Sequence, residues 1–226
     1  MPREFDLIIF DQDGTLYPVS PEMDAIYPAV ALELAAKSVR RQPSEIKADF
    51  ERKRSELASQ LNGSPTSTLT LMYHYDADMR EFEQKITRRI QLEKYVRPDP
   101  VVMKVVATIA QHYPVFLFTT NNGSTTAKIL NYLQLAKYFP PARRLTFSDI
   151  NALPISKPAK IEYLKPFLKG YELILKKYDV QPQRTLMVGD SLNMDILPAE
   201  RLGMATYHVK NPADLYALPE WLKIAQ

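Results

Sequence analysis

Two carboxylates, Asp11 and Asp13, stand close together near the start of the chain, directly after the apolar run Leu7-Ile8-Ile9-Phe10. Four consecutive large apolar residues are typical of a strand buried on both faces. Gly14 then lets the chain turn away sharply. Ligands bind at the carboxyl ends of strands in open α/β sheets, so we expect both carboxylates to project into a ligand site.

Three further polar clusters lie later in the chain, and two of them directly follow predicted strands. The clusters are Thr119-Thr120-Asn121-Asn122-Gly123, Lys165-Pro166, and Gly189-Asp190-Ser191 with Asp195. If the strands are parallel neighbours, these acids, hydroxyls and the lysine converge at one edge of the sheet. Acids packed closely repel each other and need a cation. Oxygen ligands without cysteine favour Mg²⁺ when a phosphate shares the site.

The elements that position these clusters alternate between strands and helices in the second half of the chain. We predict strands at 115–118, near 145–147, at 185–188 and near 205–207. We predict helices ending near 109 and over about 125–133, 167–178, 194–202 and 212–224. This alternation indicates a parallel sheet covered by helices on both faces. The first strand must join it, because one strand alone cannot bury two apolar faces.

Apolar residues recur at helical spacing between the two proline-containing linkers, Tyr17–Pro21 and Arg97–Pro100. Breaks at Pro43-Ser44 and Asn62-Gly63-Ser64-Pro65 divide this stretch into helices. Closing such a helical lid would exclude bulk water from the site, with the two linkers as hinges.

The expected fold is therefore an α/β protein with a Rossmann-like, doubly wound parallel sheet. Residues 1–16 and 98–226 form the α/β core that carries the polar clusters, and residues 17–97 form an all-helical cap domain inserted after the first strand.

Composition excludes several classes of protein. The 226 residues include no cysteine, which rules out disulfides, thiolate catalysis and cysteine-based zinc sites. No apolar run approaches the roughly 20 residues of a membrane helix, and the acidic start lacks the features of a secretion signal. We therefore expect a cytoplasmic protein with no membrane partner. The net charge of +3 does not indicate a nucleic-acid partner, and we expect short basic clusters such as Arg52-Lys53-Arg54 to be solvated surface.

Together these motifs resemble the haloacid dehalogenase superfamily, in its phosphatase branch. The family's first motif, Asp-x-Asp-Gly-Thr-Leu after an apolar strand, matches Asp11 to Leu16, and Thr119 and Asp190 fit the second and fourth motifs. Lys157 and Lys165 both precede a proline and compete for the third motif. We prefer Lys165, because it lies 25 residues before Asp190 and the family's lysine-helix-strand run follows without a gap. The connection 145–164 is longer than usual in the family.

The resemblance implies phosphoryl transfer. Asp11 would be the nucleophile that forms an aspartyl-phosphate. Asp13 would protonate the leaving oxygen and later activate water. Mg²⁺ would be held by Asp11, Asp190 and the backbone carbonyl of Asp13, and the substrate would be a small phosphate ester.

Other residues would assist. Thr119 and the backbone N–H of Thr120 would hold the phosphoryl oxygens, while Lys165 neutralises charge in the transition state. Further candidates are Asn121 and Asn122 for the phosphate or leaving group, Asp195 to orient Lys165 or a water at the metal, and Thr15 and Ser191 in support. For Thr15 and Ser191, capping of a turn or helix is an equally weighted alternative.

The carboxyl group of Asp13 reduces the number of reactions that the resemblance allows. Dehalogenases and phosphonatases of the superfamily lack it, which leaves a phosphatase or a phosphomutase of the beta-phosphoglucomutase type. A catalytically silent binding protein of the same fold is the alternative from another class. Looser likeness to pyrimidine 5′-nucleotidase-type members, in Leu16-Tyr17-Pro18, in residues 73–78 and in Arg97–Pro100, suggests a nucleoside 5′-monophosphate.

Four polar residues of the predicted cap, His74, Tyr75, Asp76 and Asp78, are candidates to face the substrate. We favour packing and helix capping for them. A second metal site at His74, Asp76 and Asp78 is disfavoured, because residues two apart do not share one helix face.

Overall fold

Five parallel strands form the centre of the protein in the computed structural model, which describes residues 4–60 and 67–224. The strands are β1 (Leu7–Phe10), β2 (Val115–Phe118), β3 (Arg144–Leu145), β4 (Thr185–Gly189) and β5 (Ala205–His208), in the order β3-β2-β1-β4-β5. In the middle strand, Ile8 lies between Val115 of β2 and Leu186 of β4. All of β1 is buried, which explains its uninterrupted apolar sequence.

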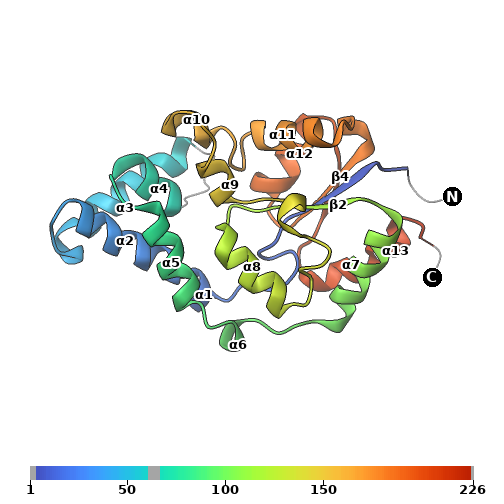
Figure 1. Ribbon diagram of the computed structural model, residues 1–226, viewed down its shortest axis with the longest axis horizontal. Coiled ribbons are helices and arrows are strands. Elements are labelled where there is room, and N and C mark those ends of the chain that lie inside the picture. Colours follow the sequence, from blue (N-terminus) through green and yellow to red (C-terminus); the bar gives the residue numbers. More distant parts are fainter. Residues whose placement is uncertain (1–3, 61–66, 225–226) are drawn as a thin grey trace.

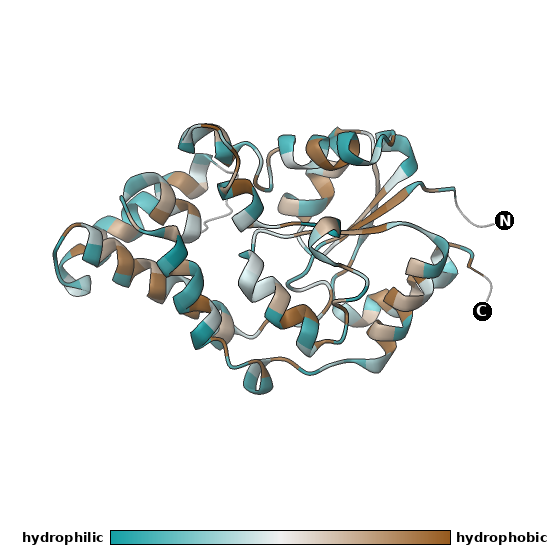
Figure 2. Cartoon of the chain, in the orientation of Figure 1, coloured by the Kyte–Doolittle hydropathy of each residue, from teal (hydrophilic) through white to brown (hydrophobic). Residues whose placement is uncertain are grey.

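Helices cover both faces of this sheet, as predicted (Figure 1). One side carries α11 (Lys169–Tyr178) and α12 (Leu197–Arg201), and the other carries α7 (Pro100–His112), α8 (Gly123–Tyr132) and α13 (Leu218–Trp221). The strands are largely hydrophobic, whereas the surrounding helices mix hydrophobic and hydrophilic residues (Figure 2). On the α11 side, the rings of Phe118 and Tyr171 meet edge to face with centroids 4.9 Å apart.

A helical insert leaves the sheet after β1 and returns before α7, which confirms the predicted arrangement (Figure 1). It comprises α1 (Pro21–Asp24), α2 (Ile26–Ser38), α3 (Pro43–Gln60), α4 (Ser67–His74), α5 (Met79–Arg89) and α6 (Leu92–Tyr95). Helix α2 contacts α3, α4 and α5, and buries Val30 and Leu34. The predicted break at Asn62–Pro65 lies outside the described residues, and the division into domains at 16/17 and 97/98 stays a prediction.

The strand predicted near 145–147 is shorter than expected. It ends at Leu145, because Thr146 caps α9 (Phe147–Asn151). The Thr146 hydroxyl accepts from the backbone N–H of Asp149, and the Asp149 carboxylate accepts from the backbone N–H of Thr146. This reciprocal pair makes Phe147 the first residue of a helix rather than the last of a strand.

Two predicted helices are also divided. Within 212–224, the 3₁₀-helix Pro212–Ala217 is followed by α13, and Pro219, which has no N–H, lies in the first turn of α13. The helix predicted over 194–202 begins as the π-turn Leu192–Ile196 before α12, where Pro198 again lies in the first turn.

The long connection after β3 reaches the insert. It contains α9 and α10 (Lys157–Ile161), and α10 contacts α4. On the surface, Lys157 pairs with Asp76 at 3.4 Å. Across the described ranges, no helix combines the length and apolar character that crossing a membrane requires.

Candidate active site

The carboxyl ends of β1 and β4 bring three carboxylates together. Asp11 follows β1, Asp190 follows β4, and Asp195 lies on the π-turn beyond it; one oxygen of each lies within 4.8 Å of the others. The Thr15 hydroxyl lies between two of them, 3.2 Å from Asp11 Oδ2 and 3.5 Å from Asp190 Oδ1. Gly14 has a φ of +82°, and a Cβ there would overlap the Asp190 carboxylate, so the close approach requires glycine.

A buried ammonium group lies against this cluster. Lys165 Nζ is 2.6 Å from Asp11 Oδ1 and 2.6 Å from Asp195 Oδ1. Burial lowers the pKa of Lys165, but the two carboxylates raise it by more, so the lysine stays charged. The second oxygen of Asp195 accepts from the backbone N–H of Ser191 at 3.1 Å. The structure thus brings Lys165 into the cluster and leaves Lys157 on the surface.

The side chain of Asp13 lies apart from the three carboxylates. It accepts hydrogen bonds from the Tyr17 hydroxyl, from Gln12 Nε2 at 3.1 Å and from Asn121 Nδ2 at 3.3 Å. Burial and the nearby Asp11 carboxylate raise the pKa of Asp13 to about 6, against the lowering effect of these donors. A carboxyl group with such a pKa can both give and take a proton near neutral pH.

Asn121 connects Asp13 to the insert. Its Oδ1 accepts from the Tyr27 hydroxyl at 3.0 Å, and Tyr27 lies on α2. The amide is thereby turned so that its NH₂ group faces Asp13. Burial and the Asp13 carboxylate raise the pKa of Tyr27 well above its usual range, so its hydroxyl remains a donor.

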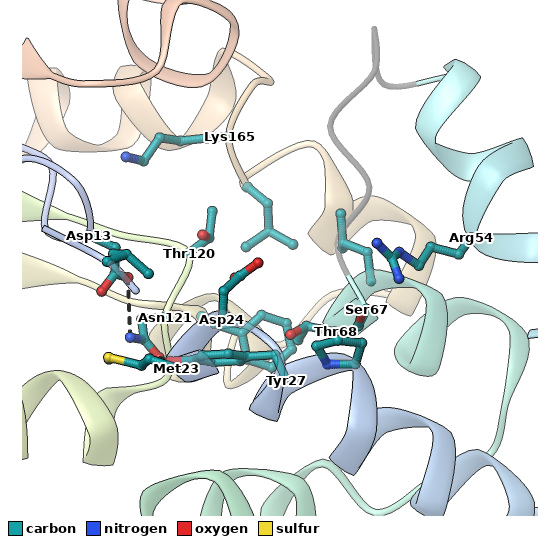
Figure 3. Close-up of a pocket in the computed structure, with 15 residues that line it drawn as sticks. Asp13, Met23, Asp24, Tyr27, Arg54, Ser67, Thr68, Thr120, Asn121 and Lys165 are labelled. Carbon is teal, nitrogen blue, oxygen red and sulfur yellow. Dashed lines mark hydrogen bonds between the residues drawn. The ribbon is translucent and has the colours of Figure 1, made fainter. Parts of the chain in front are cut away.

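A cavity of about 260 Å³ lies between the core and the insert (Figure 3). From the core it is lined by Asp13, Thr120, Asn121, Phe147, Leu164 and Lys165. From the insert its polar lining is Asp24, Tyr27, Arg54, Ser67 and Thr68. Pockets for drug-sized ligands measure roughly 300–1,000 Å³, so this cavity suits a smaller molecule.

Of the remaining predicted site residues, some lie in or beside the cavity wall and others cap the start of a helix. Thr119 is buried, and its Oγ1 accepts from the backbone N–H of Asn121 at 3.1 Å. Thr120 lines the cavity. Asn122 does not: its Oδ1 caps α8 by accepting from Thr125 N at 2.8 Å. Ser191 likewise caps the π-turn, accepting from Met194 N at 3.2 Å.

The residues that the insert contributes to the cavity were not among the candidates predicted from the sequence. Arg54, expected on the solvated surface, lines the cavity. A signal was present, because Arg54 lies four residues after Phe50 and three before Leu57, and both are buried. Asp24 and Tyr27 carried no comparable signal.

The polar segment of residues 73–78 does not line the cavity. Tyr75 packs against Phe50 with ring centroids 5.7 Å apart, Asp78 caps α5, and Asp76 is exposed. Packing and capping, the favoured interpretation, is confirmed for Tyr75 and Asp78. Over residues 4–60 and 67–224, His74, Asp76 and Asp78 do not gather into a metal-binding group.

The three-carboxylate cluster fits a hard cation. Two of its carboxylates, Asp11 and Asp195, share the one ammonium of Lys165. Burial and the Asp11 charge raise the pKa of Asp190 to about 6, the behaviour of a carboxylate short of positive charge. Carboxylate oxygens without sulfur or imidazole suit Mg²⁺.

Comparison with known proteins relates this site to a family. Residues 5–203 match the haloacid dehalogenase-like hydrolases. An HAD phosphatase from Thermococcus onnurineus is similar at 20% identity and a TM-score of 0.58, covering 96% of this chain and 97% of that one. The HAD-hydrolase YfnB from Bacillus subtilis, solved bound to magnesium, is similar at 19% identity and a TM-score of 0.58, covering 98% and 100%.

A 2-haloacid dehalogenase from Pseudomonas syringae is similar at 22% identity and a TM-score of 0.55, covering 97% of this chain and 98% of that one. A phosphatase and a dehalogenase therefore match almost equally well. Likeness at this level shows the fold, so the chemistry has to come from the residues of the site.

Proposed function

Because the chain belongs to the haloacid dehalogenase-like hydrolases, we propose that it is a Mg²⁺-dependent phosphatase that hydrolyses a small phosphomonoester through an aspartyl-phosphate. The environment of Asp13 carries this proposal. Asp13 lines the cavity, two residues after the proposed nucleophile Asp11, and its pKa is raised to about 6. An alkoxide leaving group needs a proton from such an acid, whereas a departing halide does not.

In the first step Asp11 attacks phosphorus. Lys165 donates to its Oδ1, and Thr15 lies within hydrogen-bond distance of its Oδ2, so the carboxylate is held in one orientation. The bond from phosphorus to the ester oxygen breaks, and that oxygen takes a proton from Asp13. In the second step Asp13 accepts a proton from water, whose oxygen attacks the phosphorus, and Asp11 and inorganic phosphate are released.

Phosphoryl charge is balanced from the same edge of the sheet. Lys165, Thr119 and the backbone N–H of Thr120 are assigned to the phosphoryl oxygens, supported by the presence of Thr120 and Lys165 in the cavity lining.

Three groups are assigned to Mg²⁺: Asp11, Asp190 and the backbone carbonyl of Asp13. Bound there, the ion reduces the repulsion between an anionic nucleophile and an anionic substrate. Asp195 is assigned to positioning Lys165, because Lys165 and the backbone N–H of Ser191 already occupy its two oxygens.

The narrower expectation of a nucleoside 5′-monophosphate has weaker support. It came from three sequence segments, and no side chain of those segments lines the cavity. We therefore limit the proposed substrate to a small phosphomonoester.

Hydrolysis of p-nitrophenyl phosphate by the purified protein, with and without Mg²⁺, tests the proposal. We expect phosphate release only with the ion. Net isomerisation of a sugar phosphate with slow phosphate release would instead indicate a phosphomutase. Absence of any turnover would favour a binding protein.

A further inference from the structure

Two oppositely charged side chains line the insert side of the cavity, Asp24 from α1 and Arg54 from α3. In the part of the chain that the structure describes, no ion pair joins them. Figure 3 shows the Asp24 carboxylate and the Arg54 guanidinium directed toward the space between core and insert. Each is therefore available to a molecule bound in that space.

Arg54 keeps hydrogen-bonding capacity. Its Nη1 lies 3.2 and 3.4 Å from the two carboxylate oxygens of Glu51, and within the described ranges no partner is recorded for Nε or Nη2. A guanidinium has five N–H donors, so most of them remain unused. Its side chain is only 28% exposed, which limits competition from water.

Arg52, two residues earlier on α3, offers a direct contrast. It pairs with Asp49 at 2.5 Å and with Glu56 at 2.7 Å, its side chain is 59% exposed, and it does not line the cavity. Two arginines of one helix thus differ in environment: Arg52 pairs with two carboxylates on the exposed surface, whereas Arg54 pairs with one and lies beside the cavity.

In the proposed function, the opposite side of the cavity binds the phosphoryl group. Asp13, Thr120 and Lys165 line it from the core, facing Arg54 across the space in Figure 3. A phosphomonoester bound there directs its leaving group toward the insert. A volume of about 260 Å³ favours a short leaving group.

We propose that Asp24 and Arg54 form a distal subsite for a leaving group that carries an acid, as in a phosphorylated small hydroxy acid. Arg54 binds the acid, and Asp24 accepts a hydrogen bond from a hydroxyl or amine beside it. This subsite rests on the proposed phosphatase function and names its substrate class. A nucleoside offers hydroxyls to Asp24 but no acid to Arg54, so nucleoside monophosphates are poorer substrates.

The test uses two esters that differ in one group. 3-Phosphoglycerate carries a carboxylate where glycerol 3-phosphate carries a hydroxymethyl group. A charge-assisted hydrogen bond in a partly buried site corresponds to about tenfold or more in affinity. We expect kcat/KM to favour 3-phosphoglycerate by about that factor, mainly through KM.

Substitutions test whether Arg54 causes the preference for 3-phosphoglycerate over glycerol 3-phosphate. Arg54→Gln should bring the ratio of the two kcat/KM values close to one, and Arg54→Lys, which keeps the charge, should retain part of it. Arg52→Gln is the matched control and should leave the ratio unchanged. Circular dichroism and melting curves establish that each variant is folded.

Asp24 is tested separately with 3-phosphoglycerate and its analogue without the 2-hydroxyl. The intact protein should favour the hydroxylated ester by about fivefold, since an exposed carboxylate forms a weaker hydrogen bond than a buried one. Asp24→Ala should remove that difference.

Binding provides a readout that does not depend on turnover. Calorimetry with the Asp11→Asn protein should show tighter binding of 3-phosphoglycerate than of glycerol 3-phosphate, and Arg54→Gln added to it should abolish the difference. Equal binding of the two esters, or an equal loss for both in Arg54→Gln, overturns the subsite. Failure to hydrolyse p-nitrophenyl phosphate overturns the phosphatase instead, and calorimetry still decides the subsite.

Discussion

The two sides of the cavity differ in how their charged groups are held. On the core side, Lys165 is 2% exposed and is shared between Asp11 and Asp195 at 2.6 Å each. On the insert side, Asp24 is exposed and Arg54 has only one recorded ion-pair partner among the described residues. Groups held rigidly before the substrate arrives suit catalysis, because they need no reorganisation during the reaction. Groups with unused donors and acceptors suit recognition.

The largest expected effect is on the core side. Asp11→Asn removes the nucleophile, and we expect turnover of p-nitrophenyl phosphate to fall by at least about 10⁴-fold. The fold should survive, because Lys165 keeps its bond to Asp195. Steady-state rates measure the turnover, and circular dichroism shows whether the fold is retained. If substantial turnover remains, the nucleophile lies elsewhere.

Next in size is the loss of the buried ammonium. Lys165→Met leaves Asp11 and Asp195 without their common partner, and breaking a buried pair in this way costs about 3–5 kcal/mol. Urea unfolding should show this loss of stability, and steady-state assays should show a loss of activity. Lys157→Met is the control: its pair with Asp76 is solvent-exposed, so stability should not change measurably. Similar losses in the two variants would remove the distinction between the lysines.

Mg²⁺ binding should depend on pH. Without metal, Asp13 and Asp190 have a pKa of about 6, above the 3.8 expected of an unfolded aspartate. The folded state therefore binds protons more tightly, and stability falls as pH rises from about 4 to about 6. Mg²⁺ at the Asp190 carboxylate competes with the proton there, so the affinity for the ion should weaken below about pH 6.

Melting temperatures with and without Mg²⁺ at pH 5 and pH 8 measure this linkage. The stabilisation by Mg²⁺ should be clearly larger at pH 8. Equal stabilisation at both pH values would mean that the ion does not bind at the Asp190 carboxylate.

The smallest expected effect comes from the hydrogen bonds that connect the insert side of the cavity to the core side. Tyr27→Phe removes the hydroxyl that orients Asn121 toward Asp13. We expect about a tenfold loss with an alkyl phosphate, whose leaving oxygen needs a proton, and little change with p-nitrophenyl phosphate, whose leaving group does not. Tyr75→Phe, which removes a hydroxyl 3.3 Å from Asp49 and away from the cavity, is the control. A uniform loss across both esters would assign Tyr27 a structural role only.

Much of the core could be predicted because its signals are local. The run Leu7–Phe10 is apolar at every position, as a strand covered on both faces requires, and the acids directly after such a strand lie at the sheet edge. The end of β3 was misplaced, although Thr146 and Asp149 have capping-box spacing. There the short apolar run through Phe147 outweighed the capping signal.

The insert was predicted as a helical lid over the site, but the residues with which it lines the cavity were not identified. Arg54 and Arg52 belong to one basic cluster and look alike in a linear sequence. Helical periodicity places Arg54 on the face of Phe50, yet it does not say what that face meets. The positions of Asp24 and Tyr27 depend on how α1 and α2 approach the loop after β2, which no local pattern encodes.

By itself, then, the sequence determined a parallel α/β sheet with a helical insert after its first strand and an acidic cluster at one sheet edge. These follow from hydrophobic periodicity and from residues adjacent to strand ends, and both are properties of short segments. Spacing from Asp190 favoured Lys165 over Lys157, but only the tertiary structure shows that Lys165 is the lysine buried between Asp11 and Asp195. It alone placed Arg54 and Asp24 beside the cavity, since contacts between distant helices arise from packing of the whole chain.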